Sequence, residues 1–158
     1  MKSKFIDGVR QVYEENREGL FTYAMSLAGK PEEAEDAVQA AFFSLLQRSR
    51  LPRQVRPYVY RCVRNAVIDA HRRKKTRRPS AEDPVNSEYA ERNPVRDRAL
   101  SQCLSRLSQS ESEAIILKVF GGLGFREIAS VSGEAVSTVS SRYRRGLQKM
   151  RTMLEECP

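Results

Sequence analysis

The chain has 158 residues, 40% of them apolar and 30% charged, and carries a formal net charge of +8. This length suits one compact domain or two small ones, and the apolar content is enough for a core. No apolar run approaches the ~20 residues of a membrane span and the amino end does not look like a signal peptide. We therefore expect a cytoplasmic protein with no membrane insertion.

The positive charge is concentrated in one block of the chain. Residues 50–79 hold 11 basic side chains and one acidic side chain, Asp69, whereas residues 1–49 and 80–100 are each net −2. Such a block attracts polyanions, and release of counterions from nucleic acid favours its binding. A solvated basic face without a partner is the alternative.

The residues of metal and catalytic sites are sparse and scattered. Cys62, Cys103 and Cys157 are far apart, and His71 is the only histidine, so no metal or other cofactor is expected. A nuclease would need clustered carboxylates or a histidine pair, and neither is present. The sequence therefore predicts a binding protein and not an enzyme.

Apolar residues at three- and four-residue spacing predict helices in the amino-terminal third. Gly19 is a candidate break between two helices, and Gly29 is a candidate carboxyl-terminal cap. Pro31, followed by Glu32 and Glu33, is typical of a helix start. An apolar stripe continues from there to Leu46. Residues 51–56, with prolines at 52 and 57, are predicted to form a loop.

A long helix is predicted from about 57 to 75. One side carries an apolar stripe that includes Cys62, and another side carries Arg61, Asn65, Asp69 and Arg72. The helix ends in a run of basic residues. Residues 76–95 contain three prolines among polar residues and few apolar anchors, which is typical of a flexible linker.

The last third predicts a helix-turn-helix. Ser108 and Glu111 match a capping box at the start of a helix that ends at the glycines 121, 122 and 124. A short helix over 125–131, a turn over 132–134 and a long helix from 135 to about 154 follow. The amino end of such a second helix enters the major groove of DNA. An ordinary helical hairpin is the alternative. Strand-like alternation is absent, so we expect an all-α fold.

Three segments in order resemble the extracytoplasmic-function sigma factors of bacterial RNA polymerase. YAMSLAGKPEEAEDAVQAAFFSLLQR (23–48) is similar to the polymerase-binding segment of that family, PYVYRCVRNAVIDAHRRKK (57–75) to its promoter −10 helix, and residues 107–151 to its −35-binding domain. The resemblance implies two small helical domains: a region 2-like domain over 1–75 and a region 4-like helix-turn-helix domain over 96–158, with residues 76–95 as the flexible linker.

The resemblance also implies a role for individual residues. Asp36, Gln39 and Phe42 fall where the family docks on core RNA polymerase. In the −10 region, Tyr58 and Tyr60 would hold a melted strand, with a core role as the alternative for Tyr58. The remaining −10 residues would contact promoter DNA, with the arginines of the preceding loop as a phosphate-binding rim: Arg53, Arg56, Arg61, Asn65, Arg72 and Arg73. The −35 contacts would come from Arg126, Ser137, Thr138, Ser141, Arg142, Arg144 and Arg145.

Several positions depart from the family pattern. Ala40 replaces a glutamate that usually follows the glutamine at 39, which weakens the inferred docking contact. Ser132 and Glu134 stand where the turn usually buries apolar residues, and a buried glutamate without a partner would be unfavourable. Ser137 and Ser140 replace the usual glycine and lysine, and the lost lysine removes a phosphate contact. These departures predict weak DNA binding by the helix-turn-helix, or an unusual element.

Two other functions share parts of this pattern. A regulator that does not load polymerase would have the helix-turn-helix but not residues 23–75. A sigma-like mimic that titrates an anti-sigma factor should lack the basic helix. Sigma factors of this family are commonly held inactive by an anti-sigma factor, and exposed apolar residues near Phe42 and Phe43 suit such a partner. The predicted partners are core RNA polymerase, promoter DNA and an anti-sigma factor.

Overall fold

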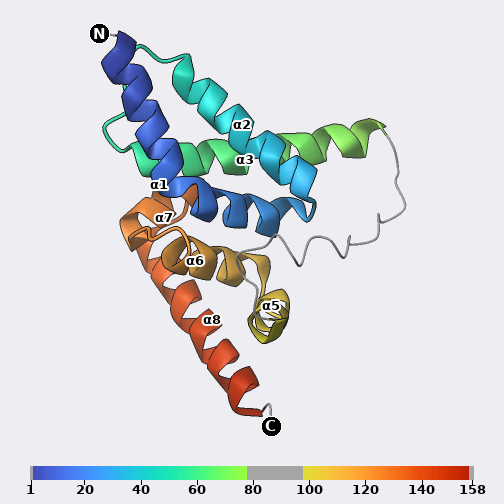
Figure 1. Ribbon diagram of the computed structural model, residues 1–158. Helices are drawn as coiled ribbons and strands as arrows, with labels where there is room; N and C mark the ends of the chain where they lie inside the picture. Colours follow the sequence, from blue (N-terminus) through green and yellow to red (C-terminus); the bar gives the residue numbers. More distant parts are fainter. Residues whose placement is uncertain (1, 78–97, 157–158) are drawn as a thin grey trace.

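The computed structural model describes residues 2–77 and 98–156, and within these ranges every regular element is a helix. Figure 1 shows two groups of helices, one made of α1–α3 and one of α5–α8. The all-α prediction is therefore confirmed. The linker predicted over 76–95 lies outside the described residues, except for Thr76 and Arg77 at the end of α3. The helices are α1 (Lys2–Ala28), α2 (Pro31–Leu46), α3 (Val55–Arg77), α5 (Arg98–Ser105), α6 (Gln109–Val119), α7 (Phe125–Ser132) and α8 (Val136–Glu156).

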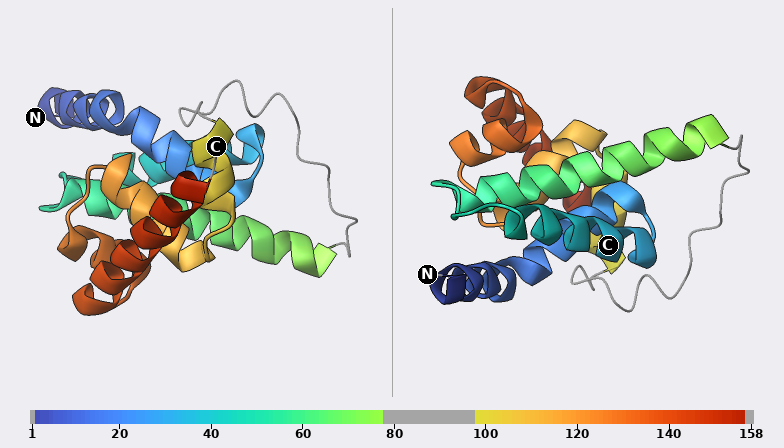
Figure 2. Two further views of the ribbon diagram at one scale, coloured as in Figure 1. Left: turned by 90° about the horizontal axis from the view of Figure 1, so that it is seen from below. Right: turned by 90° about the horizontal axis from the view of Figure 1, so that it is seen from above.

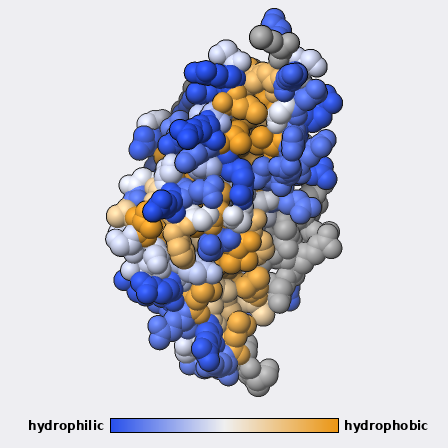
Figure 3. Space-filling view, turned by 90° about the vertical axis from the view of Figure 1, so that its left-hand side faces the viewer, coloured by the Kyte–Doolittle hydropathy of each residue, from blue (hydrophilic) through white to orange (hydrophobic). Residues whose placement is uncertain are grey.

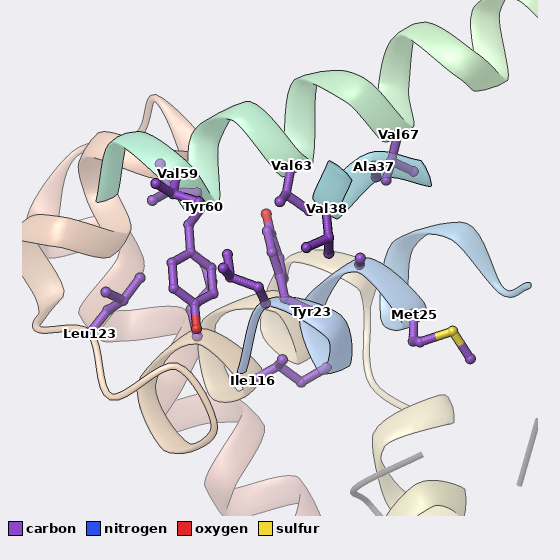
Figure 4. Packing of buried hydrophobic residues seen from close by; sticks show 14 of the residues in the cluster. Tyr23, Met25, Ala37, Val38, Val59, Tyr60, Val63, Val67, Ile116 and Leu123 are labelled. Carbon is purple, nitrogen blue, oxygen red and sulfur yellow. The ribbon is translucent and has the colours of Figure 1, made fainter. Parts of the chain in front are cut away.

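The first three helices form a bundle because each contributes an apolar stripe to one core. Leu20, Leu45 and Val63, one from each helix, are fully buried. Figure 4 shows Val63 of α3, Val38 of α2 and Tyr23 of α1 projecting into the shared space between the helices. Burying one such aliphatic side chain contributes about 1.5–3 kcal/mol. The bundle therefore fixes which side of α3 faces inward.

The turns of this bundle follow the predicted signals. Gly29 ends α1 with a φ of +78°, a left-handed conformation that glycine adopts without strain. Pro31 occupies the first turn of α2, after Lys30 as the N-cap. The loop before α3 is shorter than predicted, because α3 begins at Val55. Pro57 lies in its first turn, where a missing N–H leaves no hydrogen bond unmade.

The helix break predicted at Gly19 is wrong. α1 continues from Lys2 to Ala28, although Figure 1 shows that it bends along its length. Gly19 instead lies against the second group of helices, where a Cβ atom would come within 2.9 Å of the backbone oxygen of Phe120. Because it has no side chain, this glycine lets the two backbones approach closely. The contact is long-range, so the local sequence does not reveal it.

A capping box and an ion pair organise the second group. The Ser108–Glu111 pattern predicted the capping box. The Ser108 hydroxyl accepts from the Glu111 amide, and the Glu111 carboxylate accepts from the Ser108 amide, each at 3.2 Å. Lys149 of α8 donates to the same carboxylate at 2.9 Å. This hydrogen bond from Lys149 outweighs burial and lowers the pKa of Glu111. One carboxylate thus caps α6 and ties α8 to it.

The predicted helix-turn-helix is confirmed in α7 and α8. Gly133 ends α7 with a φ of +71°, and α8 begins three residues later at Val136. α8 then crosses α6 closely. A Cβ atom on Gly146 would lie 2.6 Å from Cδ1 of Ile115, so the absence of a side chain there sets the distance between the two helices.

The two groups of helices pack against each other. α7 contacts α3, and α6 contacts α1. Both views of Figure 2 place the segment around α7 beside the first part of α3, whereas the far end of α3 extends beyond the other helices. Figure 4 shows Tyr60 of α3 pointing toward Leu123, so buried residues of both groups join in one core.

Replacing Ser108 with alanine should lower the free energy of unfolding by about 1 kcal/mol, because it removes the N-cap acceptor of α6. Urea unfolding followed by circular dichroism measures this loss. Ser105→Ala is the matched control, since the exposed Ser105 hydroxyl only donates to Gln102 O in α5. It should change stability by less than ~0.5 kcal/mol. Equal losses in both variants would contradict the capping role.

Candidate nucleic-acid and protein interfaces

α3 presents four of its predicted DNA-binding residues on an exposed side. Val59, Val63 and Val67 lie four residues apart on one buried side, and a helix advances about 100° per residue, so Arg61 and Asn65, two positions from these valines, turn to the opposite side. The outward group consists of Arg61, Asn65, Arg72 and Arg73, all exposed. On the projecting end of α3, Lys74 and His71 approach the Glu33 carboxylate of α2, the histidine at 3.9 Å. The Glu33 carboxylate of α2 thus pairs with the basic end of α3 and links the two helices there.

The two tyrosines predicted to hold a melted strand occupy different environments. Tyr58 is half-buried, and the guanidinium carbon of Arg48 lies 5.1 Å from its ring centroid, within cation–π range. Tyr60 is only 1% exposed. Its burial raises the pKa to about 12, against the opposing charge of Arg56. The prediction of Tyr60 as a stacking residue is therefore corrected: its ring fills the core and offers no free face.

Arg56 is also placed differently from its prediction as a phosphate contact. Its side chain is half-buried, with Nε donating to Asn16 Oδ1 at 3.3 Å and Nη2 donating to the backbone oxygen of Gly121. Arg53, by contrast, is exposed in the loop before α3. In this arrangement Arg53 can reach a phosphate, whereas Arg56 is engaged within the protein.

The amino end of α8 forms a second polar surface. Ser137, Arg144 and Arg145 are exposed, and Thr138 and Ser141 are half-buried. Arg126 is exposed on α7. Arg142 pairs with the Glu134 carboxylate at 2.9 Å, so the glutamate in the turn is neither fully buried nor unpaired. Glu134 is therefore partly exposed and paired with an arginine at the amino end of α8, although it stands at a position where an apolar residue was expected.

Contacts on the opposite side fix the orientation of α8. Val139 is buried, and the rings of Tyr143 and Phe125 meet edge-on with centroids 5.4 Å apart. Lys118 of α6 lies 4.9 Å above the Phe125 ring. The residues that hold α8 are therefore separate from those that it presents to solvent.

A groove between α1 and α2 is lined by aromatic and apolar side chains with a polar rim. It has a volume of about 950 Å³. Phe42 is buried at its floor, where its ring meets that of Tyr13 edge-on at 5.1 Å, and Phe43 is 64% exposed. Asp36 and Gln39 are exposed on α2, and Gln39 lines the groove. The other lining residues are Arg17, Glu18, Phe21, Glu35, Val38 and Leu46.

The α1 side of this groove was missed by sequence reasoning, which considered α2 alone. Tyr13 of α1 is 44% exposed there, and Leu46, across the groove on α2, is 48% exposed. Figure 3 shows hydrophobic residues gathered in patches among hydrophilic ones on the face that it presents. Exposed apolar surface in a concave site is typical of a protein-binding site.

A third cluster links the two groups of helices and was also missed. The Glu113 carboxylate of α6 accepts a hydrogen bond from the Tyr23 hydroxyl at 2.5 Å and from Arg64 Nε at 2.8 Å. Burial, and then the Glu113 charge, raise the pKa of Tyr23. Burial disfavours the charge on Arg64, but Glu113 more than offsets this and raises the pKa of the guanidinium. These three residues are far apart in the sequence, and only the packing of the two groups of helices brings them together.

Residues 2–77 and 98–156 contain neither a candidate metal cluster nor a candidate membrane-spanning helix. No three histidine, cysteine or acidic side chains in this part of the chain come together as a metal site would require. None of its helices combines the length and apolar character needed to cross a membrane.

Comparisons with known proteins show which family this chain resembles. Residues 12–77 match the family described as sigma-70 region 2, and residues 97–150 match sigma-70, region 4. The chain is 28% identical to the ECF RNA polymerase sigma factor SigL of Mycobacterium tuberculosis, covering 94% of this chain and 89% of SigL. It is 31% identical to the RNA polymerase sigma factor CarQ of Myxococcus xanthus, covering 78% and 75% of the two chains.

The fold as a whole is also found in a solved structure. The sigma factor RpoE of Bartonella quintana, in complex with the anti-sigma factor NepR, superposes with a TM-score of 0.73. The match covers 98% of this chain and 99% of RpoE at 21% sequence identity. At this identity the match establishes a common fold.

Glu134→Ala should strengthen binding to duplex DNA several-fold, because loss of the carboxylate frees Arg142 at the exposed end of α8. If Arg142 then reaches a phosphate, the slope of log K against log salt should steepen by about 0.9. Fluorescence anisotropy with a labelled duplex at about 50–200 mM salt measures both effects. Glu155→Ala is the control, since it removes a similar pair with Arg151 at the other end of α8. Identical affinities for the two variants would refute this role.

Proposed function

This chain belongs to the extracytoplasmic-function sigma factors of the sigma-70 family, which direct RNA polymerase to promoters, and from this membership we propose how its surfaces divide that work. The α1–α2 groove binds core polymerase, α3 holds the −10 element, and α8 binds the −35 element. The observation that carries this proposal is the exposed cationic side of α3 beside the acidic, apolar-lined surface of α2. In this division, residues 1–75 and 96–158 act as separate domains.

The groove is suited to a helix of the polymerase. Gln39 offers a polar contact in the groove, Asp36 is exposed on the same helix, and Phe43 offers a large exposed apolar surface. Phe42 acts from below, because its buried ring shapes the floor and does not itself reach far into solvent. Aromatic residues of this kind contribute most of the binding free energy in many protein interfaces.

α3 supports strand opening through charge and stacking. Unpairing and unstacking a base costs a few kcal/mol, which contacts to the exposed strand must offset. Arg61, Asn65, Arg72 and Arg73 line the exposed side of α3 and suit a DNA backbone. Tyr58, with Arg48 at its ring, is the remaining aromatic candidate for stacking on an unpaired base.

α8 supplies the duplex contact. The hydroxyls of Ser137, Thr138 and Ser141 can approach base edges or phosphates closely, while Arg142, Arg144 and Arg145 suit guanine acceptors or phosphates. Arg126 adds a charge from α7. The Glu134–Arg142 pair reduces the positive charge of this end, which agrees with the modest −35 affinity that the sequence departures imply.

An anti-sigma factor is the third partner that we propose. The solved relative is a complex with such a protein, and the apolar groove beside Phe42 and Phe43 offers a surface for one. Occupation of the groove would exclude the polymerase by direct competition.

Catalysis is left to the polymerase. Sigma factors are in general initiation factors without enzymatic activity, and we propose no reaction or cofactor for this chain. We propose that it acts together with the polymerase in the cytoplasm.

The decisive experiment is run-off transcription with purified bacterial core polymerase on a library of random promoters. Core-dependent initiation at a defined promoter set supports the sigma function. A regulator or a sigma-like mimic would bind DNA or a protein without initiating transcription. Failure to bind core enzyme at low salt, with the fold intact by circular dichroism, would exclude the proposed function.

Arg61→Ala and Asn65→Ala should weaken promoter opening by about 1–3 kcal/mol while leaving affinity for core polymerase nearly unchanged. Permanganate reactivity of the opened strand and run-off yield measure the first effect, and pull-down or anisotropy with core enzyme measures the second. Arg151→Ala, which removes an exposed arginine far along α8, is the control.

Asp36→Ala should show the reverse pattern, with weaker core binding and normal promoter opening once core is saturating. Its control is Asp7→Ala, an exposed acid near the start of α1. If α2 and α3 variants reduced both readouts to the same extent, the division of labour between the two helices would be wrong.

A further inference from the structure

The basic helix α3 carries one carboxylate on its outward side. Figure 4 shows Val67 pointing from α3 toward Ala37 of α2, and both residues are buried. Asp69 follows Val67 by two positions, a rotation of about 200°, so it lies on the opposite side, where it is exposed. Asn65 and Arg72 share this side, about 6 Å before Asp69 and 4.5 Å after it along the axis. DNA that contacts these two residues therefore also meets the Asp69 carboxylate.

This carboxylate has no hydrogen-bond or ion-pair partner within the described part of the chain, although cations surround it. Arg72 and Arg73 follow three and four positions later, the spacing at which a helix brings opposite charges together. The ion pairs that α3 does form lead to other acids, on α6 and α2. Asp69 is therefore available to a hydrogen-bond donor from outside the protein.

The chemistry of a carboxylate limits what it can bind on DNA. An ionised carboxylate only accepts hydrogen bonds. Phosphate oxygens are also acceptors and repel it, and the sugar of DNA lacks the 2′-hydroxyl donor of RNA. In the major groove of paired DNA, the donors are the amino groups of cytosine (N4) and adenine (N6). A direct hydrogen bond from DNA to Asp69 must therefore come from a base and not from the backbone.

The place of Asp69 along α3 separates it from the residue suited to unpaired bases. Tyr58, the candidate for stacking, lies 11 residues earlier, which is about 16 Å along the helix axis. This distance equals roughly five base-pair steps of ~3.4 Å. From Arg61 to Arg77, α3 contains no phenylalanine, tyrosine or tryptophan on which a second unpaired base could stack. The surface around Asp69 therefore suits paired DNA better than an opened strand.

We propose that Asp69 is a specificity-determining residue, whose carboxylate accepts a hydrogen bond from the N4 amino group of a cytosine in the duplex next to the opened −10 strand. Cytosine N4 is the donor that acidic side chains read in the major groove. A base pair without an amino group at this place leaves the carboxylate unpaired beside phosphates, which is unfavourable. The inference rests on the proposed promoter function, because that function brings DNA to α3.

The test compares the DNA sequences that holoenzymes select. Holoenzyme is assembled from core polymerase and the full-length chain, and bound duplexes are recovered from a library randomised over the −10 element and its flanks. The wild type should prefer cytosine over thymine at one position, on the order of tenfold. Asp69→Ala should lose this preference. Asp69→Asn should move it toward adenine, because an amide pairs with N6 and N7 of that base.

The matched control is Asp7→Ala, which removes an exposed carboxylate from α1 and should retain the wild-type preference. Circular dichroism checks that each variant keeps its helix content. If Asp69→Ala does not fold, Asp69→Asn, which keeps the size of the side chain, decides the matter.

A second measurement identifies the atoms involved. The preferred cytosine is replaced by 2-pyrimidinone, a base that lacks the N4 amino group. This replacement should weaken binding of the wild-type holoenzyme roughly tenfold and leave binding of the Asp69→Ala holoenzyme nearly unchanged. Equal losses in the two proteins would show that the amino group does not contact Asp69, and would overturn the proposal.

A carboxylate that only reduces the positive charge of α3 has a different signature. Its removal would strengthen binding to all sequences alike and steepen the salt dependence, with every base preference retained. That outcome would refute a role in specificity. Failure of the chain to bind core enzyme would remove the promoter function and this inference with it. A holoenzyme that selects promoters with the same preferences in wild type and Asp69→Ala would remove this inference alone.

Discussion

α3 is in contact with three different environments, and the rotation of about 100° per residue along a helix assigns its side chains among them. Val59, Val63 and Val67 lie in the α1–α3 core, Tyr60 and Arg64 face the second group of helices, and Arg61 and Asn65 face solvent. A shift of the helix by two residues, a rotation of about 200°, would turn the valines outward and Arg61 and Asn65 inward. The apolar packing of α3 is therefore the constraint that aims its basic side outward.

Much of the fold follows from local patterns. The apolar stripes, Gly29, the Ser108–Glu111 capping box and the glycine in the turn before α8 each act within one or two helical turns, so the sequence alone predicts them. Asp36, Gln39, Arg61 and Asn65 follow from the same reasoning, since residues opposite a buried stripe are exposed. Their functional roles come from the family resemblance and stay predictions.

The positions that the structure places differently from their local interpretation share one physical cause. Gly19, Arg56 and Tyr60 each have a local interpretation, as a helix break, a phosphate contact and a stacking ring. Each is instead determined by the segment near Phe120 and Gly121, about sixty or more residues away in the chain. The partnership of Tyr23 and Arg64 with Glu113 is of the same kind. Periodicity reports which side of a helix is buried, but not which distant helix covers it.

The residues of α8 fall into two sets, one that packs against the protein and one that faces solvent. Val139, Tyr143 and Gly146 anchor the helix against α6 and α7, whereas Ser137, Arg144 and Arg145 make little use of the protein interior. Exchanges at exposed positions usually alter stability by no more than ~0.5 kcal/mol. Replacements at these positions can therefore change what α8 presents to solvent while its support stays intact, so its outer surface can vary independently of the fold.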